Sequence, residues 1–574
     1  MTSRILIMVL YGLITSPFSN AQSNHRLFIP PLKIPLSLSA SFAELRADHY
    51  HSGIDIKTQG ETGKEVIAVA DGYVYLILVS PVGFGKAIFL RHPSGYSTVY
   101  GHLERYSPEI EEYINAQQYQ SKSYAVSIYP PPDRFRITQG QIIGFSGNTG
   151  SSSGPHLHFE VRKSDGEKPV NPLLFNFGIK DNLKPVFQRL VIYPRSDRTS
   201  INGNSEELIL YPAGANGDYS LPGGTEIPVN GPAGFGITAY DYINDTPGRF
   251  GINSIQLQID SVIWYSYEIN EFSFYETRYI NAHIDYEALI KNNIEIEKTF
   301  VLPNDKLSLY KSFMNNGVYD FNDNRKHRIS IIIKDGSNNK SVLSFITKPA
   351  QPKNIMKAEA KDSSLIIMPF GKTNSFISQG VKVNIPAGSL YDTLYFRYFK
   401  TPGNGNLYSG IHHIHNKFTP LQKAYSLSIK PDTIPADKAS KLLIVQIDDR
   451  MRRTSTGGTL ANGYITADIM SFGNFAIGID TIPPVVSANG FADGSDLTNK
   501  SEIRLGITDD LSGIKSYTGT IDGNWTLFEY DAKNDVVFYK FDPQRITKGS
   551  KHRLVMVVTD NRGNTSSLTR NFTW

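Results

Sequence analysis

The sequence predicts a mainly β protein with several domains. Its 574 residues exceed what one core supports, because a domain usually holds about 100 to 200 residues. The 32 Tyr, 31 Phe, 47 Gly and 32 Pro are typical of short strands joined by tight turns. The chain has no Cys, which excludes disulfides, thiolate ligands and a cysteine nucleophile. Any metal must therefore be held by His and carboxylate side chains.

The N-terminal segment has the pattern of a secretory leader. Arg4 precedes the apolar run ILIMVLYGLI, and the small residues SNA stand before Gln22. We therefore predict a signal peptide over residues 1–21 and an exported mature chain; an uncleaved interfacial helix is the alternative. No later stretch reaches about 18 consecutive apolar residues, so no transmembrane segment is expected. The net charge is +4, or +3 without Arg4, which is too small to favour nucleic acid.

Two histidines lie one residue apart in GPHLHFEVR, residues 154–162, which otherwise reads as a buried strand. Successive side chains of a strand point to opposite faces, so His156 and His158 share one face. A zinc site that performs chemistry usually has three protein ligands and one open position. This histidine pair therefore needs a ligand from elsewhere in the chain.

The segment HYHSGIDIKT offers His51 and Asp55 as further candidates. In a straight strand their Cα atoms would be about 13 Å apart, too far for two donors on one ion. The β-branched Ile54 and Ile56 argue against a helix, whereas Gly53 can supply a bend. We expect the chain to bend at Gly53 so that the two side chains converge.

Two further segments lie between these candidates. VIAVADGYVYLILV at residues 66–79 and GKAIFLRHPSGYSTVYGHL at residues 85–103 each predict strand, turn and strand, the second ending near His102. In TQGQIIGFSGNTGSSSG, the glycines and serines that crowd the stretch before the paired histidines predict a loop that another part of the chain approaches closely.

Together, HSGID, YGHL and GNTGSSSGPHLHFEVR resemble, in this order, the motifs of lysostaphin-type (LytM-like) zinc metallopeptidases. The resemblance covers about residues 40–175. It implies that His51, Asp55 and His158 bind Zn²⁺ and that His102 and His156 are catalytic. No position that the family requires is missing.

The resemblance implies an exported zinc endopeptidase of the cell envelope, periplasmic or extracellular, that cleaves the peptide crosslinks of bacterial peptidoglycan. Its partners would be peptidoglycan stem peptides. We assign the general base to His156 and oxyanion support to His102, and the opposite assignment stays open. The alternative is a non-catalytic envelope scaffold or activator that binds wall or a partner protein. A protease acting on other proteins is a third possibility.

We expect this peptidase domain to span residues 28–180, with an insertion at 107–138. Within the insertion, SPEIEEYINAQQ predicts a short helix, with Ser107 as N-cap and Pro108 in the first turn. The insertion is expected to border the cleft.

The remaining sequence contains an internal repeat. DNLKPVF from residue 181 matches DTIPPVV from 480, ITAYDYINDT from 237 matches ITDDLSG from 507, and HRISIIIKDGSNNKS from 327 matches HRLVMVVTDNRGNTS from 552. Each copy predicts an immunoglobulin-like (Ig-like) β-sandwich without its disulfide, over residues 181–348 with an insertion and over 480–574. Residues 352–479 predict a third β-sandwich module. None of the three carries a catalytic pattern, and each is expected to act as a spacer or as a surface for an envelope partner.

Overall fold

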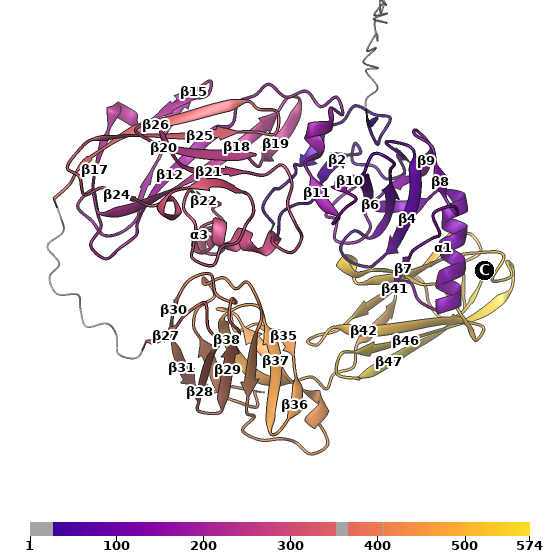
Figure 1. Cartoon of the computed structure of the whole chain (residues 1–574). Helices are drawn as coiled ribbons and strands as arrows, with labels where there is room; N and C mark the ends of the chain where they lie inside the picture. Colours follow the sequence, from indigo (N-terminus) through magenta and orange to yellow (C-terminus); the bar gives the residue numbers. More distant parts are fainter. Residues whose placement is uncertain (1–26, 47, 352–364, 406) are drawn as a thin grey trace, which may run out of the picture.

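The structure is a computed structural model that describes residues 27–46, 48–351, 365–405 and 407–574. The predicted signal peptide over residues 1–21 lies outside the described residues. Most elements are short strands, which confirms a mainly β chain with an N-terminal β-sheet domain followed by β-rich modules. Four bodies are visible in Figure 1. Within the described ranges, no helix is long and apolar enough to cross a lipid bilayer.

The N-terminal body is built on one sheet, whose central path runs β1-β2-β10-β6-β5-β4-β7. On β10, Leu157, Phe159 and Val161 are fully buried in the hydrophobic core, as the alternation of the sequence predicts. The opposite face of β10 is therefore left for polar side chains. The strands are β1 (Leu38–Ala40), β2 (Ile54–Lys57), β3 (Glu65–Ile67), β4 (Gly72–Val79), β5 (Lys86–Arg91), β6 (Tyr96–Tyr106), β7 (Val126–Ile128), β8 (Arg136–Ile137), β9 (Ile142–Ser146), β10 (His156–Lys163) and β11 (Lys168–Val170).

The helix predicted in the insertion is confirmed as α1 (Pro108–Ser121), which follows Ser107 and begins with Pro108. The helix packs against the C-terminal module: Tyr119 meets Trp525 edge to face at 5.2 Å between ring centroids, and the guanidinium of Arg545 lies 3.9 Å from the Tyr119 ring. The insertion therefore joins the first body to the last.

The second body contains two sheets, one around β12 and β18 and one along β13-β17-β26-β25-β20-β21-β23. Helices α2 (Ile280–His283) and α3 (Tyr286–Asn292) lie in the insertion predicted here. The strands are β12 (Val186–Pro194), β13 (Ser200–Ile201), β14 (Leu208–Leu210), β15 (Ala213–Ala215), β16 (Asp218–Ser220), β17 (Glu226–Asn230), β18 (Pro232–Ile243), β19 (Thr246–Phe250), β20 (Ser254–Ile259), β21 (Val262–Glu268), β22 (Glu297–Lys298), β23 (Tyr310–Phe313), β24 (Tyr319–Asp320), β25 (His327–Lys334) and β26 (Lys340–Pro349).

The third body packs the sheet β28-β29-β33-β37-β36 against β31-β32-β38-β34-β35, because side chains of both sheets share one core. Its strands are β27 (Ile366–Met368), β28 (Asn374–Ser378), β29 (Val381–Ile385), β30 (Leu394–Phe396), β31 (Tyr398–Thr401), β32 (Ile411–Ile414), β33 (Tyr425–Ile429), β34 (Leu442–Ile447), β35 (Arg453–Gly457), β36 (Thr459–Ala461), β37 (Tyr464–Ile469) and β38 (Gly473–Ile479).

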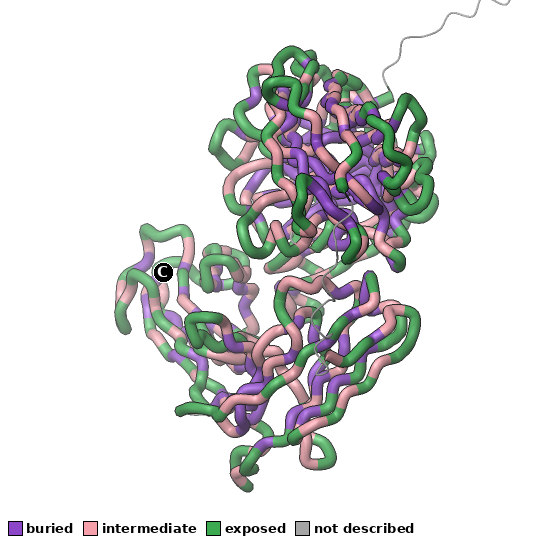
Figure 2. Tube along the Cα trace, turned by 90° about the vertical axis from the view of Figure 1, so that its left-hand side faces the viewer, coloured by how far each residue is buried: buried purple, intermediate pink, exposed green. Residues whose placement is uncertain are grey.

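The fourth body likewise packs the sheet β39-β41-β45-β44 against β40-β47-β46-β42-β43. Its strands are β39 (Val485–Ala488), β40 (Ser495–Asp496), β41 (Glu502–Thr508), β42 (Ile514–Ile521), β43 (Asn524–Trp525), β44 (Glu529–Asp531), β45 (Val536–Lys540), β46 (Lys551–Asp560) and β47 (Thr565–Thr573). Buried segments gather in the interior of the molecule and exposed segments at its periphery (Figure 2). The Ig-like topology of the second and fourth bodies stays a prediction.

The four bodies form a closed ring, in which the last module returns to the first (Figure 1). The ring is closed by an ion pair of 2.8 Å between Lys86 and Glu529, whose side chains are 5% and 15% exposed. The other junctions are made by Tyr50 with Thr277, Asn304 with Tyr391, and Arg562 with Gly458. The first and the last body are therefore in direct contact.

We expect this buried ion pair to hold the C-terminal module in place. Glu529→Met leaves the ammonium of Lys86 buried without a partner, so we expect the docking to lose about 3 kcal/mol. Amide hydrogen exchange at residues 529–534 and 83–86 should then accelerate about 100-fold.

The double variant Lys86→Met and Glu529→Met removes both charges and should recover most of the protection. Asp449→Asn, which breaks an exposed pair with Lys417, is the matched control and should leave exchange at these residues unchanged. Unaltered protection in Glu529→Met would show that the pair does not hold the module.

Candidate metal and catalytic site

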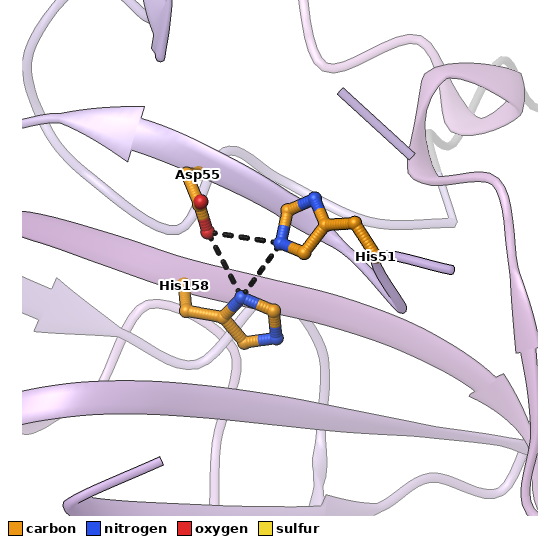
Figure 3. Close-up of side chains that lie close together, drawn as sticks. All are labelled: His51, Asp55 and His158. Atoms are coloured by element: carbon orange, nitrogen blue, oxygen red, sulfur yellow. Dashed lines mark hydrogen bonds and ion pairs between the residues drawn. The ribbon is translucent and has the colours of Figure 1, made fainter. Parts of the chain in front are cut away.

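Three of the predicted residues place one donor atom each around a single point (Figure 3). Nε2 of His51 lies 3.1 Å from Oδ1 of Asp55 and 3.1 Å from Nδ1 of His158, and the last two atoms are 2.9 Å apart. Antiparallel pairing of β2 with β10 sets Asp55 directly opposite His158. Ligands of one tetrahedral zinc ion lie about 3.3 Å apart, so this triangle has the dimensions of a three-ligand zinc site.

Gly53 makes this convergence possible. The chain bends at Gly53, as predicted, just before β2 begins. A Cβ atom there would lie 2.3 Å from the carbonyl oxygen of Phe159 and 2.8 Å from Cγ of Glu160, which is closer than atoms can approach. The glycine is therefore needed mainly because β10 passes so close.

Outer acceptors fix which ring nitrogen of each ligand histidine is free. Nδ1 of His51 lies 2.7 Å from the carbonyl oxygen of Ser41, and Nε2 of His158 lies 2.8 Å from Oε1 of Glu160. These acceptors take an N–H from the imidazoles, so in the neutral rings the opposite nitrogens present lone pairs to Asp55. Three electron-rich atoms that face one another require a cation or protons between them. Two nitrogens and one carboxylate oxygen are a donor set that fits Zn²⁺.

The electrostatics of the triangle show how strongly it favours positive charge. Burial raises the pKa of Asp55, but the imidazoles of His51, His156 and His158 outweigh burial and hold this pKa well below its usual range. Burial disfavours the charged form of His158, yet hydrogen bonds to Asp55 and Glu160 raise its pKa to about 9. Burial lowers the pKa of His51. Positive charge is therefore favoured at the point where the three donor atoms meet.

His102 and His156 flank this triangle, with their ring centroids 4.7 Å apart. Nδ1 of His102 lies 2.8 Å from the carbonyl oxygen of Thr149, and Nδ1 of His156 lies 2.8 Å from that of Gly154. Each ring can therefore donate through Nδ1 and keep its Nε2 free for chemistry. Nε2 of His156 is buried without a hydrogen-bond partner among the described residues and lies 3.5 Å from Oδ1 of Asp55.

His102 lies within β6, rather than at the end of a strand as the sequence suggested. Its φ is 59°, a left-handed conformation that costs free energy in residues other than glycine. The conformation is held by a hydrogen bond from the backbone N–H of His102 to the carbonyl of Phe84. Burial, reinforced by His158 and His156, lowers the pKa of His102 to about 3, so this ring is neutral at neutral pH. The structure thus brings all five predicted residues together.

Sequence reasoning missed Glu160, which is fully buried behind His158. It accepts hydrogen bonds from the Ser52 hydroxyl at 2.6 Å and from Nε of Arg162 at 2.5 Å, besides that from His158. Burial opposes its charge, but Arg162 and His158 outweigh burial and lower its pKa to about 2. The alternation of β10 carried the signal, because Glu160 is two residues beyond His158 on the same face.

The loop over residues 148–154 also receives support from the C-terminal module, which no local pattern predicts. Lys533 donates to the carbonyl oxygens of Asn148 and Ser152, the latter at 2.8 Å. The backbone N–H of Lys86 donates to the Thr149 hydroxyl at 2.9 Å. The carbonyl of Thr149 orients His102, so the last module supports the position of this imidazole through the loop.

Comparisons with known proteins match the segment that holds this site to a family model. Residues 49–124 and 133–172 match peptidase family M23, and residues 366–480 match a Zu5-like domain. The resemblance of the N-terminal domain to lysostaphin-type peptidases is therefore confirmed.

Two curated relatives each match about a fifth of this chain. The DD-carboxypeptidase/endopeptidase Mpg of Neisseria meningitidis serogroup B is 35% identical over 123 residues, 21% of this chain and 22% of that protein. The murein hydrolase activator NlpD of Escherichia coli is 30% identical over 125 residues, 22% of this chain and 26% of that protein. The chain thus matches only about a quarter of the length of either relative.

One solved structure is similar to part of this chain. The catalytic domain of lysostaphin from Staphylococcus simulans is 24% identical with a TM-score of 0.19, covering 24% of this chain and 91% of that one.

Glu160→Gln tests the outer support of the metal ligands. Removing the carboxylate charge behind a ligand histidine usually weakens metal binding, so we expect zinc affinity to fall about 10- to 100-fold. Competition with a chromophoric chelator at neutral pH measures this affinity.

Glu287→Gln is the control, because Glu287 forms an exposed pair with Lys291 on α3 of the second body and should leave zinc affinity unchanged. Equal affinities in wild type and Glu160→Gln would contradict the role assigned to Glu160.

Proposed function

We propose that this chain is an exported zinc metalloendopeptidase that hydrolyses the peptide crosslinks of bacterial peptidoglycan. The observation that carries the proposal is the triangle of His51, Asp55 and His158, whose lone pairs face one point beside two further imidazoles. A purely structural cluster would not need two additional histidines with free Nε2 atoms. The relative named DD-carboxypeptidase/endopeptidase supports the same chemistry.

The proposed chemistry divides the five residues into ligands and proton carriers. His51, Asp55 and His158 would hold the ion. A zinc ion bound there supplies a lowered pKa for coordinated water and polarises a peptide carbonyl. His156 would take the proton from the attacking water, and His102 would support the developing oxyanion. Both rings present Nε2, so the geometry is equally compatible with the exchanged assignment.

The proposed substrate class is supported by the match to peptidase family M23 and by the predicted export. A DD-endopeptidase acts on bonds between D-centres, and the crosslink between D-Ala and diaminopimelate is of this type. We propose this bond rather than a glycine bridge, because no lysostaphin-style targeting module is recognisable in the sequence. The expected location is the cell envelope, periplasmic or extracellular.

A second candidate function is a non-catalytic activator or scaffold of the envelope. It is favoured by the relative named a murein hydrolase activator and by the three β-rich bodies that follow the N-terminal domain. These bodies offer surfaces for an envelope partner. An activator would promote wall cleavage only when a separate hydrolase is present.

Purified mature chain with zinc should release crosslinked muropeptide products without any partner, as measured by mass spectrometry. We expect about one zinc per chain. His158→Ala should lose both zinc and activity. His102→Ala should keep the zinc and lose activity by about 100- to 10,000-fold, because general acid–base catalysis contributes about this much.

The control is His49→Ala, which removes an exposed imidazole two residues from His51 and should behave as wild type. Equal digestion by wild type and His158→Ala would refute zinc catalysis. A zinc-loaded wild type that digests no muropeptide alone but accelerates an added hydrolase would establish the activator instead. Digestion of casein but not of muropeptides would identify a general protease.

A further inference from the structure

The second and fourth bodies, which contain the two copies of the internal repeat, each gather three aspartates far from the zinc-type site. The first cluster is Asp181, Asp241 and Asp335, and the second is Asp480, Asp509 and Asp560. Within each cluster, one oxygen of every residue lies within 4.8 Å of the others. Four of the six residues are at least nine-tenths buried: Asp241, Asp335, Asp480 and Asp560. Like charges collected away from water strongly repel one another unless a cation or a proton neutralises them.

No basic side chain supplies that cation. Within the described part of the chain, none of the six carboxylates forms an ion pair with Lys, Arg or His. Arg562, which lies beside the second cluster, directs its Nη1 to the carbonyl oxygens of Leu442 and Gly458 instead. No Lys, Arg or His side chain of the described residues therefore neutralises the clusters.

Each cluster also contains a carboxylate oxygen that is buried and has no hydrogen-bond partner. Oδ1 of Asp241 is such an atom, on a side chain that is only 4% exposed, and Oδ1 of Asp509 is its counterpart in the other copy. Buried carboxylate oxygens are almost always paired, and each exception requires an explanation. In each cluster, a ligand between the three aspartates would pair the carboxylate oxygen that lacks a partner.

The two clusters are held in the same way. The Asn339 amide donates to Asp335 at 2.8 Å and to the carbonyl of Asp181 at 3.4 Å. The Asn564 amide donates to Asp560 at 2.6 Å and to the carbonyl of Asp480 at 3.2 Å. The cluster is therefore a recurrent feature of the repeat.

We infer that each copy of the repeat binds one calcium ion between its three aspartates. The donors are all oxygen, which suits a hard cation, whereas zinc and copper prefer nitrogen and sulfur. Three carboxylates offer up to six oxygens, and Ca²⁺ takes about six to eight, with water or backbone carbonyls completing the shell. Mg²⁺ fits less well, because it demands near-ideal octahedral geometry and keeps its own water.

The position of each site indicates what the ion would do. Asp181 lies in the segment that leaves the first body, and Asp480 directly follows β38, the last strand of the third body. The other aspartates belong to the sandwich that comes next in each case. Calcium would therefore tie the incoming linker to the sandwich and stiffen both junctions. This inference does not depend on the proposed hydrolytic function.

Equilibrium dialysis of the full mature chain against radioactive Ca²⁺, with Mg²⁺ in excess, tests the inference. We expect two Ca²⁺ per chain, with dissociation constants of about 0.1–1 mM, as in other extracellular modules. Asp241→Asn and Asp509→Asn should each bind one ion, and the double variant none. Asp449→Asn, an exposed aspartate outside both clusters, is the control and should bind two.

Each single variant keeps the other site as an internal standard of folding. Calcium should also raise the thermal transition of wild type, and this shift should vanish in the double variant. His158→Ala should still bind two Ca²⁺, which separates this inference from the zinc site. The inference is overturned if wild type takes up no calcium, if Mg²⁺ abolishes the binding, or if the single variants still bind two ions.

Discussion

The structure depends on a close approach of two antiparallel strands that forces three lone pairs to face one another. Asp55 on β2 stands opposite His158 on β10, and His51 reaches the same point because the chain bends at Gly53. A side chain at position 53 would separate the strands, since its Cβ would collide with the backbone of β10. Glu160 then fixes the tautomer of His158 from behind. The site is thus built by backbone proximity as much as by its ligands.

Much of this site could be predicted from the sequence because strand geometry is local. A period of two places His156 and His158 on one face, and the same rule places Glu160 there, although its role was not predicted. The bend at Gly53 was also predictable, but its main cause was not. The steric need for glycine comes from Phe159, which lies more than a hundred residues away in the sequence and becomes a neighbour only when the sheet forms.

Contacts between bodies could not be predicted, because no periodic pattern encodes them. Lys86 and Glu529 are ordinary charged residues in the sequence, and only the closed ring buries them together. The aspartate clusters were more predictable than these contacts between bodies and less predictable than the metal site. The repeat was recognisable, yet Asp241 follows the matched isoleucine by four residues and Asp509 by only two. This offset hides their equivalence until the fold brings each of them into the aspartate cluster of its own copy.

Donor chemistry separates the two kinds of acidic site in this chain. Asp55 shares its site with imidazoles, which suits a borderline cation, whereas Asp241 and its partners offer oxygen alone. The all-oxygen clusters stand at junctions of the same ring that Lys86 closes. Lys533, in the last body of the ring, donates to the loop over residues 148–154. The carbonyl of Thr149 in this loop orients His102. A closed ring transmits a change at one junction to the others. Stiff junctions would therefore keep the loop over residues 148–154, and with it the imidazole of His102, in one position.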